Sequence, residues 1–126
     1  MRSLKRFGAI AGACLLILAG CNGAEETSTG SDPQGDMARG AELIAAKGCG
    51  TCHEIPGIDG ATGRVGPPLD HVGERMFIAG MLDNTPENMR TWLMDPQAVV
   101  PGNAMPDTGL DQEEADQVAA YLRSLR

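Results

Sequence analysis

Large aromatic side chains are scarce in this sequence, which has one Trp, one Tyr and two Phe among 126 residues. Glycine, by contrast, occurs 17 times. The length favours a single domain, and a domain of this size with so few large side chains builds only a thin hydrophobic core. We therefore expect a bulky buried ligand to supply part of the interior.

Positively charged residues are also few, with 10 Lys and Arg against 17 Asp and Glu. Three of the basic residues, Arg2, Lys5 and Arg6, stand at the N-terminus, so the chain after residue 20 carries a formal charge of −10. This balance argues against charge-driven binding to nucleic acid or to anionic lipid. It favours a partner with a basic docking face.

A hydrophobic run long enough to span a membrane is missing. The apolar stretch at residues 7–20 has about 14 positions and follows the basic N-terminus, a pattern typical of a signal-peptide core. It ends in LAGC at residues 18–21, which resembles the lipobox of bacterial lipoproteins. We expect cleavage before Cys21 and attachment of lipid to its thiol. An ordinary signal peptide or an uncleaved anchor is the alternative.

The chain is predicted to have three parts. Residues 1–20 form the lipoprotein signal peptide. Residues 21–35 are polar, acidic and rich in Gly, Ser and Thr, and they are predicted to form a lipid-anchored, flexible tether. Residues 36–126 are predicted to form the folded domain.

Helical signals dominate the predicted domain, and no alternating strand pattern is present, so the predicted fold class is all-α. Thr85 is a candidate N-cap, and Asp111 with Glu114 matches a capping box. The expected helices cover residues 37–47, residues 86–95 and the segment after Asp111, with a further short helix at residues 75–82.

Cysteine is another scarce residue type, with four in the chain. One lies in the predicted signal peptide and another is Cys21, so Cys49 and Cys52 remain. They form the sequence CGTCH, with His53 directly after the second cysteine. This motif is the attachment signature of c-type haem, because its spacing lets two thiols reach the two vinyl groups on one edge of the macrocycle while His53 faces the iron. Gly50 is expected to keep the turn open.

Three other interpretations of the motif stay open. A zinc site needs three or four protein ligands, and His71 is the only other Cys or His after residue 21. A redox-active dithiol expects a βαβ context, which the pattern lacks, although an exported pair could form a disulfide. The motif could also occur by chance in a loop.

A second axial ligand for the iron is expected from a methionine. Met105 lies in the loop sequence VPGNAMPDTG at residues 100–109, where Pro and Gly residues shape the chain. A thioether is a soft ligand that raises the reduction potential, and a rigid loop can aim its sulfur. Methionines on a predicted helix more often fill the core. The alternatives to Met105 are His71 and four further methionines: Met76, Met81, Met89 and Met94.

Five motifs occur in order along the predicted domain: GCGTCH, GPPL, WLMDP, PGNAMP and VAAYL. Together they resemble a class I (monohaem) bacterial cytochrome c of the small lipoprotein type. The resemblance implies the cytochrome c fold, with three to four short helices wrapped around one haem c attached covalently through Cys49 and Cys52. It also implies that the first and last helices pack together through Gly40, Ile44, Val118, Tyr121 and Leu122.

The same resemblance assigns three further haem contacts. In GPPL, the carbonyl of Pro67 is expected to accept the imidazole N–H of His53, which would orient the ring. Trp92 and Arg75 match positions near the haem propionates or the methionine side, where an indole N–H and a guanidinium suit two carboxylates. Arg64 competes with Arg75 for that role, and core packing is the alternative for Trp92.

The expected function is one-electron transfer in a respiratory chain, without enzymatic activity. His53 and Met105 stay bound while the iron cycles between ferrous and ferric. The protein is expected to be an exported, lipid-anchored monomer facing the periplasm or the cell exterior. A quinol-oxidising complex would be the donor, and a terminal oxidase or reductase the acceptor. The Gly-rich loop at residues 54–65 departs from the family pattern and could cover the haem edge or dock a partner. The alternatives are a haem enzyme or gas sensor with an open or labile sixth iron position, and a structural lipoprotein without haem.

Overall fold

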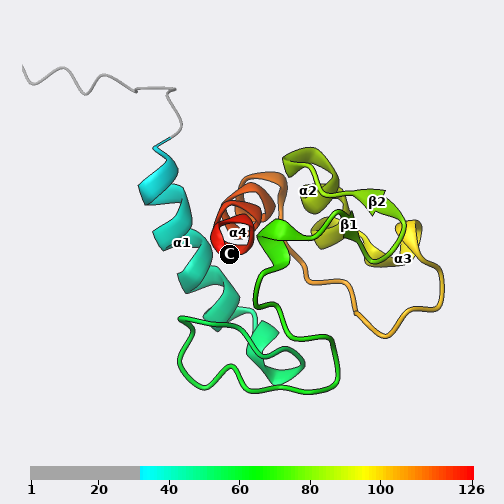
Figure 1. Ribbon diagram of the computed structural model, residues 1–126, viewed down its shortest axis with the longest axis horizontal. Coiled ribbons are helices and arrows are strands. Elements are labelled where there is room, and N and C mark those ends of the chain that lie inside the picture. The colour runs from blue at the N-terminus through cyan, green and yellow to red at the C-terminus, as the bar shows by residue number, and fades with distance from the viewer. Residues whose placement is uncertain (1–31) are drawn as a thin grey trace, which may run out of the picture.

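The computed structural model describes residues 32–126, which form a mostly helical domain (Figure 1). Within them are four α-helices, two 3₁₀ turns and one two-stranded ribbon. The helices are α1 (Pro33–Ala46), α2 (Pro86–Met94), α3 (Pro96–Val99) and α4 (Gln112–Ser124), the 3₁₀ turns are η1 (Cys49–Thr51) and η2 (Val72–Glu74), and the strands are β1 (Phe77–Ile78) and β2 (Leu82–Asp83).

The predicted signal peptide, the lipidation site Cys21 and the tether up to residue 31 lie outside the described residues. In the part of the chain that the structure does describe, no helix is long and apolar enough to cross a membrane.

Helix α1 begins at Pro33, ahead of the predicted start at residue 37. The Asp32 side chain accepts a hydrogen bond from the backbone N–H of Gln34 at 3.2 Å, and Pro33 occupies the first helical turn. An N-cap followed by proline is a strong start signal for a helix. Residues 33–35 therefore belong to the helix and not to the tether that their polar composition predicts.

The predicted caps of the other two long helices are confirmed. Thr85 accepts a hydrogen bond from the backbone N–H of Asn88 at 3.2 Å, and α2 ends at Met94. At the start of α4, the Asp111 carboxylate accepts from the Glu114 N–H at 2.9 Å, and the Glu114 carboxylate accepts from the Asp111 N–H at 3.2 Å. These reciprocal bonds satisfy backbone donors that a helix N-terminus leaves free.

The prediction of a short helix at residues 75–82 is wrong. After the η2 turn, the chain forms the β1–β2 ribbon, with Phe77 opposite Asp83 and Ile78 opposite Leu82. The tip turns at Ala79 and Gly80, which have φ values of 51° and 71°. Two successive positive φ angles suit a hairpin turn and not a right-handed helix.

The packing of the first helix against the last is confirmed. Figure 1 shows α1 and α4 side by side, with α2 on the other side of α4. A Cβ atom added to Gly40 would lie 2.1 Å from the backbone oxygen of Gln117, so only glycine allows this approach. Ile44 and Val118 are each only 1% exposed beside the contact. This crossing fixes the end of α1, from which the CGTCH segment emerges.

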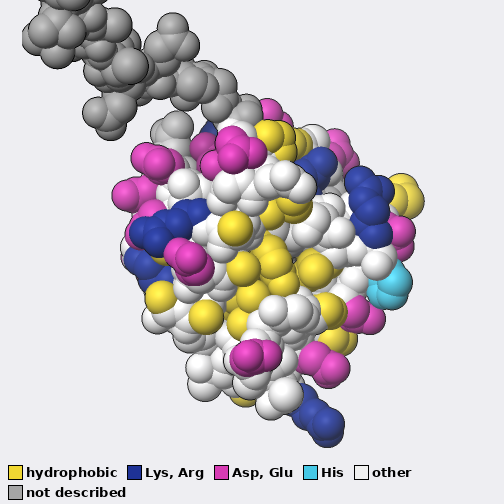
Figure 2. Space-filling view, turned by 90° about the vertical axis from the view of Figure 1, so that its left-hand side faces the viewer, with side chains coloured by type: hydrophobic (Ala, Val, Ile, Leu, Met, Phe, Trp, Pro, Cys, Tyr) yellow, Lys and Arg dark blue, Asp and Glu magenta, His cyan; other side chains and the backbone are white. Residues whose placement is uncertain are grey.

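The molecular surface combines charged margins with apolar patches. Figure 2 shows the face on the α1 side, where acidic and basic side chains lie around the margin and hydrophobic side chains gather near the centre. The largest apolar exposures elsewhere in the described chain include Met76 and Met81 beside the ribbon, at 76% and 66%.

Candidate functional site

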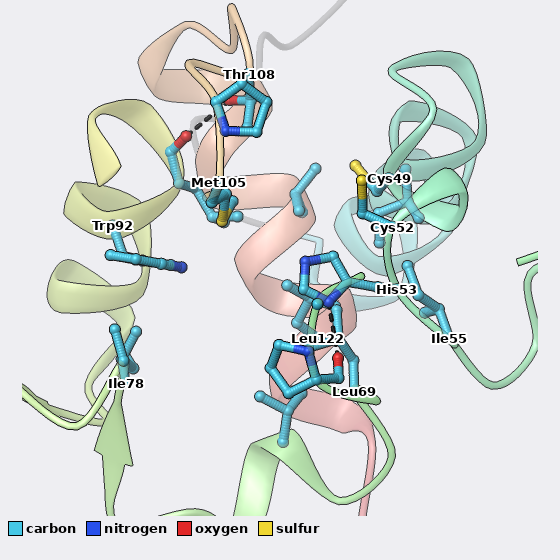
Figure 3. Close-up of a pocket in the computed structure, with 18 of the residues that line it drawn as sticks. Cys49, Cys52, His53, Ile55, Leu69, Ile78, Trp92, Met105, Thr108 and Leu122 are labelled. Atoms are coloured by element: carbon cyan, nitrogen blue, oxygen red, sulfur yellow. Dashed lines mark hydrogen bonds between the residues drawn. The ribbon is translucent and has the colours of Figure 1, made fainter. Parts of the chain in front are cut away.

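A cavity of about 460 Å³ lies between the cysteine-bearing segment on one side and α2 with the loop before α4 on the other (Figure 3). This volume lies within the range of cofactor pockets. Its walls are mostly apolar, with contributions from α1, α4 and the ribbon. Every site residue proposed from the sequence for the folded domain lines this one cavity: Cys49, Cys52, His53, Pro67, Arg75, Trp92 and Met105.

The two cysteines are presented by a tight turn. The backbone N–H groups of Cys52 and His53 both bond to the carbonyl of Cys49, at 3.2 and 3.0 Å. Both thiols are free and half-buried, and Figure 3 shows them on the same wall as His53. Burial raises the pKa of the Cys49 thiol above its usual value, which favours the protonated thiol at neutral pH.

Gly50 has a role different from the predicted one. Its φ is not positive, so the turn itself does not require glycine there. A Cβ atom at this position would lie 2.6 Å from the Cβ atom of Ala61. Gly50 therefore allows the loop after the motif to pack directly against the turn.

The His53 ring is held by the GPPL segment. Its Nδ1 atom lies 2.7 Å from the carbonyl oxygen of Pro67, the contact expected from the sequence. Because a carbonyl only accepts, Nδ1 carries the proton of the neutral ring, and the lone pair of that ring is then on Nε2. The ring also lies against Gly66, where an added Cβ atom would come within 2.3 Å of the imidazole. The ring is thus fixed with a free nitrogen on the cavity side (Figure 3).

Met105 extends into the cavity from the wall opposite His53 (Figure 3). It is half-buried and sits on a loop, as expected. Met89 also lines the cavity, but it belongs to α2 and is 2% exposed within the core. Three alternatives do not line the cavity: Met76, Met81 and Met94 are all exposed. The same holds for His71, which is exposed and pairs with Glu74 at 3.2 Å.

Trp92 and Arg75 lie at the cavity in different ways. Trp92 projects from α2 with its indole ring turned toward the interior (Figure 3). Arg75 donates from Nη2 to the backbone oxygens of Pro68 at 2.5 Å and Asp70 at 3.1 Å. The guanidinium thus holds the end of GPPL and the residue that follows it, and brings a positive charge to the cavity wall, 3.9 Å from the Asp70 carboxylate. Arg64, its competitor, does not line the cavity.

Two residues that connect the cavity walls are not among those predicted from the sequence. Lys47 precedes the CGTCH turn and donates to the carbonyl of Gly109 at 2.8 Å, with the Glu114 carboxylate at 3.2 Å. Thr108 donates to the carbonyl of Leu93 at 2.7 Å and so ties the end of the Met105 loop to α2. Nothing local signals either bond, because the partners lie 62 and 15 residues away.

The donor set fits a haem better than a bare metal ion. Within residues 32–126, no three His, Cys, Asp or Glu side chains gather into a metal-binding cluster. The imidazole and the thioether instead stand on opposite walls, with two thiols beside the imidazole. His with Met is an axial ligand pair of haem iron, and the apolar walls match the macrocycle between them.

Comparison with known proteins agrees with this fit. Residues 37–126 match the family model of cytochrome c. Cytochrome c2 of Agrobacterium tumefaciens is 35% identical over 105 residues, covering 71% of this chain and 91% of that protein.

Two further relatives are larger proteins. Cytochrome c oxidase subunit 2 of Bacillus sp. strain PS3 is 39% identical over 94 residues, covering 71% of this chain and 26% of that protein. The same subunit of Alkalihalophilus pseudofirmus is 37% identical over 89 residues, covering 70% of this chain and 25% of that protein. The chain therefore spans about a quarter of the length of these subunits.

Proposed function

Because the chain belongs to the cytochrome c family, we propose that it is a membrane-tethered electron carrier of a respiratory chain, with a single haem c whose iron is ligated by His53 and Met105. Family membership itself implies electron transfer, covalently bound haem c and redox partners. We further propose which residues attach the haem, which two ligate the iron, how the chain is tethered and which partners it meets.

The haem, when bound, supplies reversible one-electron exchange at its iron. Cys49 and Cys52 would each add their S–H across a vinyl group and hold one edge of the ring through thioether bonds. His53 would present Nε2, with Pro67 fixing the ring orientation. Trp92 and Arg75 would face the propionates or the methionine side, where N–H donors match carboxylates.

The observation that carries the proposal is the placement of His53 and Met105 on opposite walls of one apolar cavity (Figure 3). If both residues bound the iron of the haem, no position on the iron would remain for a substrate. A site whose ligands stay in place changes little in geometry when an electron enters or leaves. This arrangement favours a carrier over an enzyme or a gas sensor.

The acceptor we propose is a terminal oxidase, with a quinol-oxidising complex as the donor. The similarity to cytochrome c oxidase subunits supports an oxidase as the acceptor, because a segment like this chain makes up about a quarter of each of those subunits. The acidic balance of the sequence favours a basic docking face on the partner. We propose that the carrier works as a monomer.

Lipid on Cys21 would hold the domain at a bacterial membrane, facing the periplasm or the cell exterior. The support is the LAGC sequence at residues 18–21. A flexible tether raises the local concentration of the domain near membrane complexes. A radiolabelled fatty acid should be incorporated into the wild-type protein and not into Cys21→Ser; no label in either protein would argue for an ordinary signal peptide or an uncleaved anchor.

The decisive test is an optical spectrum of the reduced protein, purified from membranes, with and without carbon monoxide. A c-type spectrum that CO leaves unchanged is expected when both axial positions are filled. A spectrum that shifts with CO would contradict the ligand pair and favour a gas-binding haem protein. A colourless protein would contradict haem attachment altogether.

A further inference from the structure

The loop that carries Met105 is held by two side-chain amides. We propose that Gln97 and Asn103 are positioning residues that keep the Met105 sulfur aimed at the haem iron. This inference rests on the Met105 ligation proposed above, and it assigns the stability of that ligation to residues that do not touch the iron.

Gln97 projects from a fixed base. It belongs to α3, which is only four residues long, but the Asp95 side chain caps this helix by accepting from the Ala98 N–H at 2.9 Å. Its neighbour Pro96 is among the most deeply buried side chains of the described domain. The backbone at Gln97 is therefore held by the buried Pro96 before it and by the hydrogen-bonded Ala98 after it.

The Gln97 amide makes three hydrogen bonds to the loop. Its Nε2 atom donates to the carbonyl oxygens of Asn103 at 3.0 Å and Met105 at 2.9 Å. Its Oε1 atom accepts from the N–H of Gly102 at 3.0 Å. The side chain thus bonds to backbone N–H and carbonyl groups of the loop, as a neighbouring β-strand would.

The Asn103 amide makes three more hydrogen bonds. Its Nδ2 atom donates to the carbonyl oxygens of Pro96 at 2.8 Å and Val100 at 2.7 Å, and its Oδ1 atom accepts from the N–H of Met105 at 2.7 Å. Each amide nitrogen carries two hydrogens, so the nitrogens of both side chains use all their donors inside residues 96–105.

As a result, both backbone polar groups of Met105 are bonded to these amides, its N–H to Asn103 and its carbonyl to Gln97. The Cα atom is fixed relative to α3, and only the torsions of the methionine side chain stay free. Since a thioether is a weak, neutral ligand, its occupancy depends on how often the sulfur returns to the iron. Ordering the loop in advance reduces the entropy lost on ligation.

The test uses the full-length, haem-loaded protein and three readouts: the weak far-red thioether-to-iron absorption of the ferric form, the pH at which that band disappears, and the reduction potential. Gln97→Ala should lower the pH midpoint by at least about one unit, the tenfold weakening expected when two or more ordinary hydrogen bonds are lost. The potential should fall, and the ferrous variant should begin to bind CO.

Asn103→Asp provides an independent variant, since it keeps an acceptor for the Met105 N–H but loses both donors. Gln97→Glu keeps the size of the side chain and replaces the Ala variant if that one takes up no haem. Gln112→Ala is the matched control, because it removes the same amide from an exposed position at the start of α4. It should leave all three readouts unchanged.

The inference would be overturned if the Gln97 and Asn103 variants both kept the wild-type absorption band, pH midpoint and reduction potential. Met105→Ala separates this failure from that of the ligation itself. Loss of the band in Met105→Ala but not in the amide variants would reject only the positioning role. A band that persists in Met105→Ala would reject both.

Discussion

The Nδ1 atom of His53 lies 2.7 Å from the carbonyl oxygen of Pro67, 14 residues further along the chain. This bond determines which ring nitrogen faces the cavity, and Gly66 leaves the space in which the ring lies. Hydrogen bonds of this kind orient a metal-binding imidazole and raise its basicity. The position of the proposed axial nitrogen therefore depends on the GPPL segment as well as on CGTCH.

Gly66→Ala should displace the imidazole, because the new Cβ atom would come within 2.3 Å of the ring. We expect the haem-loaded protein to lose about 1–3 kcal/mol of stability, as is usual for overpacking, and to show an altered reduction potential. Denaturant unfolding and potentiometry measure the two effects. Gly60→Ala is the control for the reduction potential. No atom lies within 4 Å of a Cβ built there, so any stability that this variant loses comes from its positive φ of 74° and not from a clash. A reduction potential that stays at the wild-type value in Gly66→Ala would contradict the steric role of Gly66.

Replacing Cys49 and Cys52 together with Ala should abolish covalent haem attachment, because no thiol would remain at the cavity wall. Acid–acetone extraction followed by haem staining of the denatured chain gives the measurement. Thr51→Ala, between the two cysteines, should retain the covalent haem. Haem that resists extraction from the double variant would show that attachment occurs elsewhere.

Met105→Ala should keep the covalent haem but open the sixth position of the iron. The reduction potential should fall, since a thioether ligand raises it, and CO binding should change from undetectable to stoichiometric. Potentiometry and CO difference spectra test this. Met76→Ala is the matched control, because Met76 is 76% exposed and does not line the cavity. An unchanged potential in Met105→Ala would point to a different ligand.

The Tyr121 phenol should titrate above its ordinary range, because burial raises its pKa. The hydroxyl donates to the carbonyl of Pro56 at 2.7 Å, which links α4 to the loop after CGTCH. The protonated phenol therefore contributes to the stability of the folded state. This contribution is complete below the pKa of the phenol in the unfolded chain, about 10. It is lost as the pH rises through the higher pKa of the phenol in the folded protein.

Tyr121→Phe should therefore cost about 1 kcal/mol at neutral pH, the typical net value of one hydrogen bond, and should reduce the loss of stability above pH ~10. Denaturant unfolding at neutral and alkaline pH measures both. Because the chain has a single Tyr, ultraviolet difference titration reports on this phenol alone. A phenol that titrates at the ordinary pKa would contradict the effect of burial.

Features that depend on neighbouring residues were predictable from the sequence. The caps at Thr85 and Asp111 are predictable because each N-cap side chain and the backbone N–H that it accepts from lie three residues apart. The start of α1 differs from the prediction because the polar composition around Asp32 favours a tether, whereas a cap followed by proline begins a helix. The ribbon differs from the predicted helix because Ala79, a good helix former, adopts a positive φ at its tip.

The chemistry available to this protein can be predicted from short stretches of its sequence, because the attachment motif, the loop methionine and the helix caps each lie within a few residues. Which side chains meet depends on the folded chain. Seven candidates spread over residues 49–105 line one cavity, since the crossing of α1 and α4 fixes one wall and α2 with the Met105 loop supplies the other. The roles of Lys47, Gln97 and Asn103 emerge only there, because hydrogen bonds between a side chain and a backbone carbonyl depend on the path of the folded chain and leave no periodic pattern in the sequence.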